Sequence, residues 1–338
     1  MDGPGRTDMV RTIGFLKLIR WQNLVIVILT MMLMRYAVIE PIISRIFVEL
    51  IQVPGAEVPL TLKFPWYDFI ILVFSTVAIT AAGYVINDYF DIKTDLINKG
   101  EVIVGTKIPR RRAMLWHNIL NAAGVAGGFY VSWKAGYFWL GIFFLIVSGL
   151  LYFYSASYKR QFLVGNLVVA LLTAIVPMLV AVFEWPFLYR YYTQYSVTPP
   201  ELNLVFYWVG GFALFAFITT LAREIIKDIE DFEGDKAYGR NTLPVVAGII
   251  TSRIVSVVLL LATVVLLYLV WYFFINDRIT LIYLTLTVVL PILYIMYLLI
   301  ATRTRKQLHL ASSITKIVMI SGILYSVVVK LILDKNLV

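Results

Sequence analysis

Two acidic stretches of the same design carry the residues best suited to chemistry. The first acidic stretch covers residues 87–95 (NDYFDIKTD), and the second covers residues 227–235 (KDIEDFEGD). An α-helix turns by about 100° per residue, so the aspartates of each stretch fall on one helix face, with Asn87 beside those of the first. The aspartates of the first stretch recur 140 positions later, which gives the matched set Asp88, Asp91, Asp95, Asp228, Asp231 and Asp235. This repeated cluster predicts a site that binds cations.

Carboxylates at this density favour Mg²⁺ as the bound cation. Mg²⁺ takes oxygen ligands, and its usual sites combine one or two carboxylates with substrate phosphates and water. Six aspartates in one cleft would otherwise repel each other, and some would take up protons. The two acidic stretches therefore predict that Mg²⁺ ions hold a substrate carrying several phosphate charges.

Basic and hydroxyl side chains near helix ends supply further partners for phosphate groups. Together with metal ions, they would clamp a diphosphate and neutralise its charge as it departs. Six such residues are candidates for substrate binding: Arg20, Tyr154, Ser155, Lys159, Arg223 and Lys227. Other roles compete with this one, because Arg20 also suits an anchor beside the membrane. Glu224 shares a helix face with Asp228 and Asp231, so it is placed either to tune the site or to pair with Arg223 or Lys227.

Composition requires that these residues sit on membrane helices. The chain is 61% hydrophobic with a mean hydropathy of +0.86, which excludes an ordinary soluble protein. A bilayer is spanned by about 20 apolar residues. Runs of this kind begin near Asn23, Trp66, Ala113, Gly136, Val164, Asn203, Ala247, Ile279 and Leu310. We therefore expect an all-α polytopic membrane protein with nine transmembrane helices. The absence of Cys excludes thiolate catalysis and Cys-based metal sites.

The distribution of basic residues predicts the orientation in the membrane. The N-terminus and the loops after the second, fourth, sixth and eighth runs hold 20 of the 29 Lys and Arg residues. The positive-inside rule places these segments in the cytoplasm, and both acidic stretches open into them. We expect an integral protein of the inner (cytoplasmic) membrane with its N-terminus and active site facing the cytoplasm. The net charge of +9 is thereby explained without nucleic acid.

The 140-residue offset extends beyond the acidic stretches. It carries the first four apolar runs onto the next four, which predicts a four-helix parallel repeat about an axis along the membrane normal. The repeat halves are residues 20–160 and 161–301, the ninth helix covers residues 310–333, and the whole chain, 1–338, is one domain. Such symmetry would make the two acidic stretches face each other across a cavity with apolar walls. That cavity suits a hydrocarbon tail.

At this level of detail the sequence resembles the UbiA superfamily of intramembrane prenyltransferases. Residues 87–95 match its N-D-x-x-D-x-x-x-D motif, and Asp231 and Asp235 match its D-x-x-x-D motif, with Asp228 as a frequent companion. Further matches are Arg20 and Asn23 in R-x-x-N, Tyr154, Ser155 and Lys159 in Y-S-x-x-x-K, Gly165-Asn166, and Gly239-Arg240-Asn241-Thr242-Leu243-Pro244 in G-x-x-T-L-P. The similarity extends from Arg20 to the last helix.

The resemblance implies a nine-helix bundle in which both motifs bind Mg²⁺ and a diphosphate. The implied metal ligands are Asn87, Asp88, Asp91, Asp95, Asp228, Asp231 and Asp235, and Asn23 and Asn87 join the substrate-binding residues. One departure stands out: many members have an arginine shortly after the first motif, whereas this chain reads Asn98-Lys99-Gly100-Glu101-Val102. Lys99 or one of Arg110, Arg111 and Arg112 is expected to replace that arginine.

The expected activity is Mg²⁺-dependent transfer of an isoprenyl group from a prenyl diphosphate, such as geranylgeranyl diphosphate, to a membrane-associated acceptor. Within the family, the runs DIKTDLINK and REIIKDIEDFEGD most resemble geranylgeranylglycerol-phosphate geranylgeranyltransferases. Prenylation of an aromatic acceptor for quinones is the alternative. A cation transporter is a rival from another class, but such sites usually lie near the bilayer midplane. A CDP-alcohol phosphotransferase would need Gly after Asp91, where this chain has Ile92.

Overall fold

The computed structural model describes residues 14–93, 96, 102–301 and 304–335 of the 338-residue chain. In chain order the elements of the first half are α2 (Trp21–Leu33), η1 (Met34–Ile39), α3 (Glu40–Ile43), β1 (Phe47–Glu49), β2 (Glu57–Pro59), α4 (Trp66–Phe90), α6 (Arg110–Ala135), η2 (Phe138–Leu140), α7 (Gly141–Ala156) and η3 (Tyr158–Arg160). Those of the second half are α8 (Val164–Tyr195), α9 (Asn203–Glu230), α10 (Phe232–Ala237), α11 (Leu243–Ala247), α12 (Ile249–Val270), η4 (Trp271–Ile275), α13 (Arg278–Leu284), η5 (Thr285–Val289), α14 (Leu290–Ala301) and α15 (Arg305–Asp334). The described residues are thus almost entirely helical.

Most of these helices have the length and composition of membrane spans. Within the described residues, eight segments are long and apolar enough to cross a bilayer: Trp21–Ile43, Trp66–Phe90, Phe138–Ala156, Val164–Tyr195, Asn203–Glu230, Ile249–Ile275, Arg278–Ala301 and Arg305–Asp334. Helix α6, with 26 residues, is equally long but less apolar. Each helix begins close to where its apolar run was predicted. The structure therefore confirms an all-helical chain of eight to nine long apolar segments.

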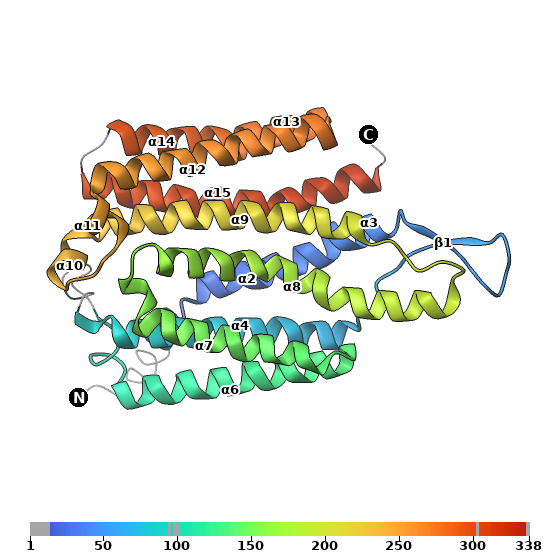
Figure 1. Ribbon diagram of the computed structural model, residues 1–338, viewed down its shortest axis with the longest axis horizontal. Coiled ribbons are helices and arrows are strands. Elements are labelled where there is room, and N and C mark those ends of the chain that lie inside the picture. Colours follow the sequence, from blue (N-terminus) through green and yellow to red (C-terminus); the bar gives the residue numbers. More distant parts are fainter. Residues whose placement is uncertain (1–13, 94–95, 97–101, 302–303, 336–338) are drawn as a thin grey trace, which may run out of the picture. The chain divides into compact units, whose positions relative to one another are not determined.

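The chain divides into two compact units, and each is described by itself. The first unit comprises Met1–Leu29, Trp66–Val168 and Asp231–Val245. In it, α4 packs against α6 and α7 (Figure 1). Gly124 and Gly128 on α6 make this packing close: a Cβ at Gly124 would lie 2.7 Å from Ile79, and one at Gly128 would lie 2.3 Å from Phe144. Small residues let membrane helices approach in this way, which explains how a weakly apolar α6 joins the group.

The second unit comprises Thr30–Pro65, Val169–Glu230 and Val246–Val338. In it, α9 packs against α12 and α15, and α14 packs against α12 and α15 (Figure 1). A Cβ at Gly322 on α15 would lie 2.1 Å from Phe215 on α9, so this helix pair also relies on a glycine contact. The same unit holds the two-stranded antiparallel hairpin, in which Val48 pairs with Val58.

A buried ion pair ties together separate segments of the second unit. Arg35 and Glu184 are 2% and 1% exposed, and Arg35 Nε lies 3.3 Å from Glu184 Oε2. The backbone N–H groups of Lys63 and Phe64 donate to Glu184 Oε1 at 2.9 Å, and Arg35 donates to the Phe64 carbonyl. Breaking such a pair leaves an uncompensated charge in an apolar setting.

We predict that Glu184→Ala lowers the free energy of unfolding by about 3–5 kcal/mol, because Arg35 is left buried without its counter-charge. Denaturant titration in detergent micelles measures this loss. The matched control is Glu40→Ala, which removes the exposed pair between Glu40 and Lys330 at 3.6 Å in the same unit. That change should cost no more than about 1 kcal/mol. Equal losses in the two variants would contradict a special role for the buried pair.

Candidate active site

The first acidic stretch lies at the end of α4, in the first unit. Asp88 belongs to the last turn of the helix, and Asp91 follows directly, with its N–H donating to the Asn87 carbonyl at 3.0 Å. Asp91 is only 7% exposed. Its helical spacing from Asp88 keeps both carboxylates on the same face. Two predicted site residues of this region, Asp95 and Lys99, lie outside the described residues.

Arg20 lies on this face and contacts both Asp88 and Tyr84. Its Nη2 lies 2.9 Å from Asp88 Oδ1, and its guanidinium lies over the Tyr84 ring, 4.9 Å from the ring centroid. Asn23 Nδ2 donates to the Tyr84 hydroxyl at 3.2 Å. Tyr84 was not among the predicted site residues, although its position one helical turn before Asp88 was a usable signal. It supports both residues of the R-x-x-N match.

Asp91 is held by two cations. Lys159 Nζ lies 2.7 Å from Asp91 Oδ1 and donates to Asn87 Oδ1 at 3.2 Å. Arg240 Nη2 lies 2.6 Å from the same Asp91 oxygen. Burial raises the pKa of the Asp91 carboxyl, but Lys159 and Arg240 outweigh burial and hold that pKa below its usual value. Asp91 is therefore ionised, and its charge is balanced within the site.

The second acidic stretch reaches the same cation. Asp231 and Asp235 lie at α10, and the Asp235 N–H donates to the Asp231 carbonyl at 3.0 Å. Asp235 is 2% exposed, and its Oδ1 lies 3.2 Å from Arg240 Nη1. Burial raises the pKa of Asp235 to about 6; Arg240 opposes this rise and Asp231 adds to it. One guanidinium thus joins a carboxylate of the first stretch to a carboxylate of the second.

The other predicted site residues lie on two helices, α7 in the first unit and α9 in the second. Ser155 is fully buried and donates its hydroxyl to the Leu151 carbonyl at 2.9 Å, so the structure gives it a helix-packing position. Tyr154 lies one residue earlier on α7, in the first unit. Three residues lie on α9 in the second unit: Arg223, Lys227 and Asp228. There Glu224 lies 2.9 Å from Arg223 and 3.4 Å from Lys227, which is the pairing that the sequence left open.

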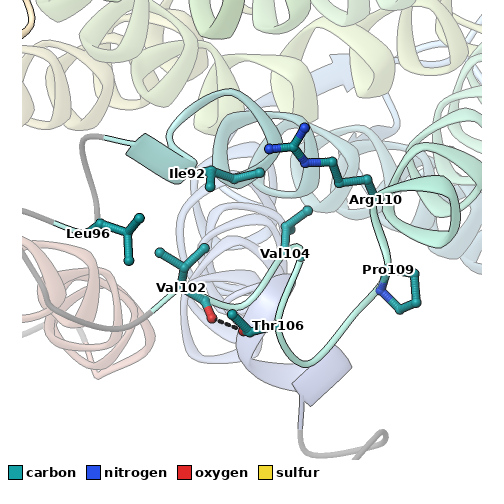
Figure 2. A pocket seen from close by; sticks show the side chains of 8 residues that line it. Ile92, Leu96, Val102, Val104, Thr106, Pro109 and Arg110 are labelled. Carbon is teal, nitrogen blue, oxygen red and sulfur yellow. Dashed lines mark hydrogen bonds between the residues drawn. The ribbon is translucent and has the colours of Figure 1, made fainter.

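A pocket of about 460 Å³ opens beside the first acidic stretch, in the loop that leads to α6. Its walls are mainly apolar, and Figure 2 shows the Arg110 side chain extending from the start of α6 towards Ile92. The loop is anchored because Val104 and Ile108 are buried in a cluster with Leu18. Of the basic residues considered as substitutes for the missing arginine, Arg110 is the one among those that the structure describes that lines this pocket.

The donor set fits a hard divalent cation. Within the described part of the chain, no three His, Asp or Glu side chains already form a metal cluster. Asp91 and Asp235 nevertheless converge on one positive charge, that of Arg240, and both are oxygen donors of the kind that Mg²⁺ prefers. Arg240 therefore marks a place where the two acidic stretches can share a cation. Sequence reasoning had assigned Arg240 only to the G-x-x-T-L-P match.

Comparison with known proteins gives one consistent result. The sequence pattern of the UbiA prenyltransferase family matches residues 55–317. The digeranylgeranylglyceryl phosphate synthase of Methanosphaera stadtmanae is 32% identical over 71% of this chain and 80% of its own length. That of Thermococcus gammatolerans is 31% identical over 79% of this chain and 87% of its own length.

Solved structures share the fold. One from work on digeranylgeranylglyceryl phosphate synthase in membranes aligns with a TM-score of 0.60 at 24% identity, covering 94% of this chain and 99% of that one. A UbiA homologue from Archaeoglobus fulgidus bound to DMAPP and Mg²⁺ aligns with a TM-score of 0.51 at 16% identity, covering 93% of this chain and 99% of that one. This chain is therefore an integral membrane protein with multiple spans.

The burial of Asp235 predicts a pH-dependent stability in the absence of metal. Because the folded-state pKa of about 6 lies above the usual aspartate value of 3.8, the folded protein binds more protons between these values, and its stability falls as pH rises through them. Asp235→Asn removes this cost. We expect the variant in EDTA to exceed the parent by about 1–3 kcal/mol at pH 7 and to equal it near pH 4.

Thermal unfolding in detergent at the two pH values measures this difference. Glu233→Gln, an exposed acid on the same helix α10, is the control and should show no such pH dependence. A variant Asp235→Asn that is less stable than the parent at pH 7 would show that the Arg240 contact outweighs the burial of the charge.

Proposed function

The chain belongs to the UbiA prenyltransferase family, and we propose that it transfers an isoprenyl group from a prenyl diphosphate to a glyceryl phosphate lipid. The proposal for the acceptor rests on the digeranylgeranylglyceryl phosphate synthase relatives, three of which are matched over four fifths or more of their own length. The proposal for the donor rests on the site itself. Its main support is that Asp91 and Asp235, one from each acidic stretch, contact the same cationic side chain.

We propose that the aspartates of both stretches hold Mg²⁺, as the Mg²⁺ in the Archaeoglobus fulgidus homologue suggests. When bound, Mg²⁺ would supply positive charge that stabilises the departing diphosphate. The described members of this ligand set are Asn87, Asp88, Asp91, Asp228, Asp231 and Asp235, and Asp95 completes it in the sequence. Asp91 and Asp235 supply oxygen donors from both stretches.

The basic residues of the first unit are suited to hold the diphosphate. Arg20 and Lys159 already face carboxylates of the first stretch at 2.9 Å and 2.7 Å, so phosphate oxygens arriving there would find donors in place. Arg110 offers a further donor at the neighbouring pocket. Departure of the diphosphate leaves an allylic cation on the prenyl group.

The location of the site in the cell follows from the distribution of Lys and Arg. We propose that both acidic stretches open to the cytoplasm, where a water-soluble diphosphate would leave.

The helices α4 and α9 end at Phe90 and Glu230, which are 140 positions apart, so the offset seen in the acidic stretches also holds for the helices before them. This agreement supports the proposal of a parallel repeat of four helices, with a ninth helix outside it.

The decisive assay is incubation of the purified protein with Mg²⁺ and geranylgeranyl diphosphate, followed by mass analysis of the lipid product. We expect product with geranylgeranylglyceryl phosphate and none with an aromatic acid such as 4-hydroxybenzoate. EDTA should abolish transfer. The double variant Asp91→Ala, Asp235→Ala should lose at least about a thousandfold in rate, because charge stabilisation of the leaving group is lost.

Product from the aromatic acid alone would replace the acceptor that we propose with a quinone precursor. Full activity in the double variant would remove the carboxylates from the reaction. Metal uptake into sealed vesicles without any prenyl donor would instead favour a transporter. Lys236→Gln, which changes an exposed charge on α10, serves as the control for purification and folding.

Tyr84 provides a second test through Arg20. Tyr84→Ala removes the ring beneath the guanidinium and the acceptor for Asn23, so we expect KM for the prenyl diphosphate to rise about tenfold, because a cation–π contact that is partly desolvated contributes about 1–2 kcal/mol. Tyr84→Phe keeps the ring and should change KM by less than about threefold. Equal effects of the two substitutions would assign the role to the hydroxyl rather than the ring.

A further inference from the structure

Arg240 is held in place by its backbone as well as by its side chain. Its N–H donates to the Asp235 carbonyl at 2.9 Å, and the N–H of Asn241 donates to the Arg160 carbonyl at 2.9 Å. Gly239, just before it, has φ +63, a left-handed conformation that glycine adopts without strain. The loop after α10 therefore brings this one arginine back to the acidic stretch that precedes it.

The guanidinium of Arg240 uses two different nitrogens for the two acidic stretches. Nη2 lies 2.6 Å from Asp91 Oδ1, and Nη1 lies 3.2 Å from Asp235 Oδ1. The side chain is 14% exposed, and both carboxylates are more buried than that. A planar fork with fixed donors is well matched to two carboxylates at once. Arg240 thus provides, within the protein, a charge that is shared by both stretches.

The other two cations described at the site, Lys159 and Arg20, contact the first stretch. Lys159 contacts Asn87 and Asp91, and Arg20 contacts Asp88, all in the first stretch. Arg240 instead bridges from Asp91 in the first stretch to Asp235 in the second. A divalent cation that binds Asp91 and Asp235 together would compete with Arg240 for these two carboxylates.

Displacing Arg240 from these oxygens without a replacement partner is unfavourable. The guanidinium stays charged at any ordinary pH, and a buried charge that loses its counter-ion costs several kcal/mol. A diphosphate supplies new anionic oxygens of the geometry that an arginine fork binds well. Metal binding should therefore be weak alone and strong when a diphosphate is present.

We propose that Arg240 is an internal counter-ion that competes with Mg²⁺ for Asp91 and Asp235 and transfers its contacts to the diphosphate when both ligands bind. This inference rests on the proposed diphosphate site and adds a coupling to it. The coupling is reciprocal: diphosphate strengthens metal binding by the same factor by which metal strengthens diphosphate binding. The enzyme would then assemble its charged site only around the complete metal and diphosphate pair.

The test uses calorimetric titration of the full-length protein in detergent, without prenyl donor or acceptor. Mg²⁺ alone is titrated first, and inorganic diphosphate is then titrated at one fixed, saturating Mg²⁺ concentration. For Arg240→Gln we expect Mg²⁺ alone to bind about tenfold tighter than in the parent, because a competing charge within hydrogen-bond distance is gone. We expect diphosphate to bind about tenfold weaker, because a charged donor is lost.

These opposite changes separate the proposal from a structural role, since a loosened loop would weaken both ligands. Arg240→Lys keeps the charge but not the fork, and should give intermediate values for both. Lys236→Gln removes an exposed charge of the same segment and should leave both affinities within about twofold, as exposed charges interact weakly through solvent. Unchanged or weaker Mg²⁺ binding by a folded Arg240→Gln protein would overturn the proposal, as would unchanged diphosphate binding.

Folding of the variant is followed in the same samples. In EDTA, Arg240→Gln should melt below the parent, and Mg²⁺ alone should raise its melting temperature more than it raises that of the parent. If Arg240→Gln does not fold, Lys159→Gln reads out the same competition at Asp91 alone, and tighter Mg²⁺ binding is again the supporting result. Because no prenyl substrate is used, a failed acceptor assay leaves this result standing, and the reverse also holds.

Discussion

The structure depends on neutralising the negative charge of carboxylates that are buried away from water. Aspartates at 2% and 7% exposure would repel each other and lose their charge if they had no cation nearby. The chain meets this constraint at the acidic stretches with Arg20, Lys159 and Arg240, each within 3.2 Å of a carboxylate. The loop after α10 returns Arg240 to the site, where it contacts both Asp91 and Asp235.

The same problem is solved differently in the second unit. There Arg35 and Glu184 form a closed pair, and Glu184 also accepts two backbone N–H groups. That arrangement has no role for an incoming anion, since both partners are almost fully buried. At the acidic stretches the side chains of Arg20 and Arg240 are 32% and 14% exposed, so these two cations are more accessible than Arg35. A fixed pair suits stability, and an exchangeable pair suits ligand binding.

Close helix contacts at glycines pack the helices of the first unit that carry the charged residues of the site. Gly124 and Gly128 allow α6 to approach α4 and α7 closely. Helix α4, which carries the first acidic stretch at its end, is therefore packed along its length. Gly165 similarly approaches the backbone of Lys159, where an added Cβ would lie 2.7 Å from its Cα. A larger residue there would displace the lysine that holds Asp91. Packing by glycine and placement of charge are therefore linked in this part of the chain.

The sequence by itself determined the helices, because apolar runs of membrane length and the spacing of aspartates are local properties of the chain. It also determined the family, because the acidic motifs recur at a fixed offset. It did not reveal that Arg240 bridges the two stretches or that Tyr84 supports Arg20. The Arg240 pairing joins Asp91 to a residue 149 positions away, and Arg20 also pairs with Asp88, 68 positions away. Only the tertiary structure decides them, since the partner that a buried charge finds is set by distance in space and by loss of water, neither of which is encoded in neighbouring residues.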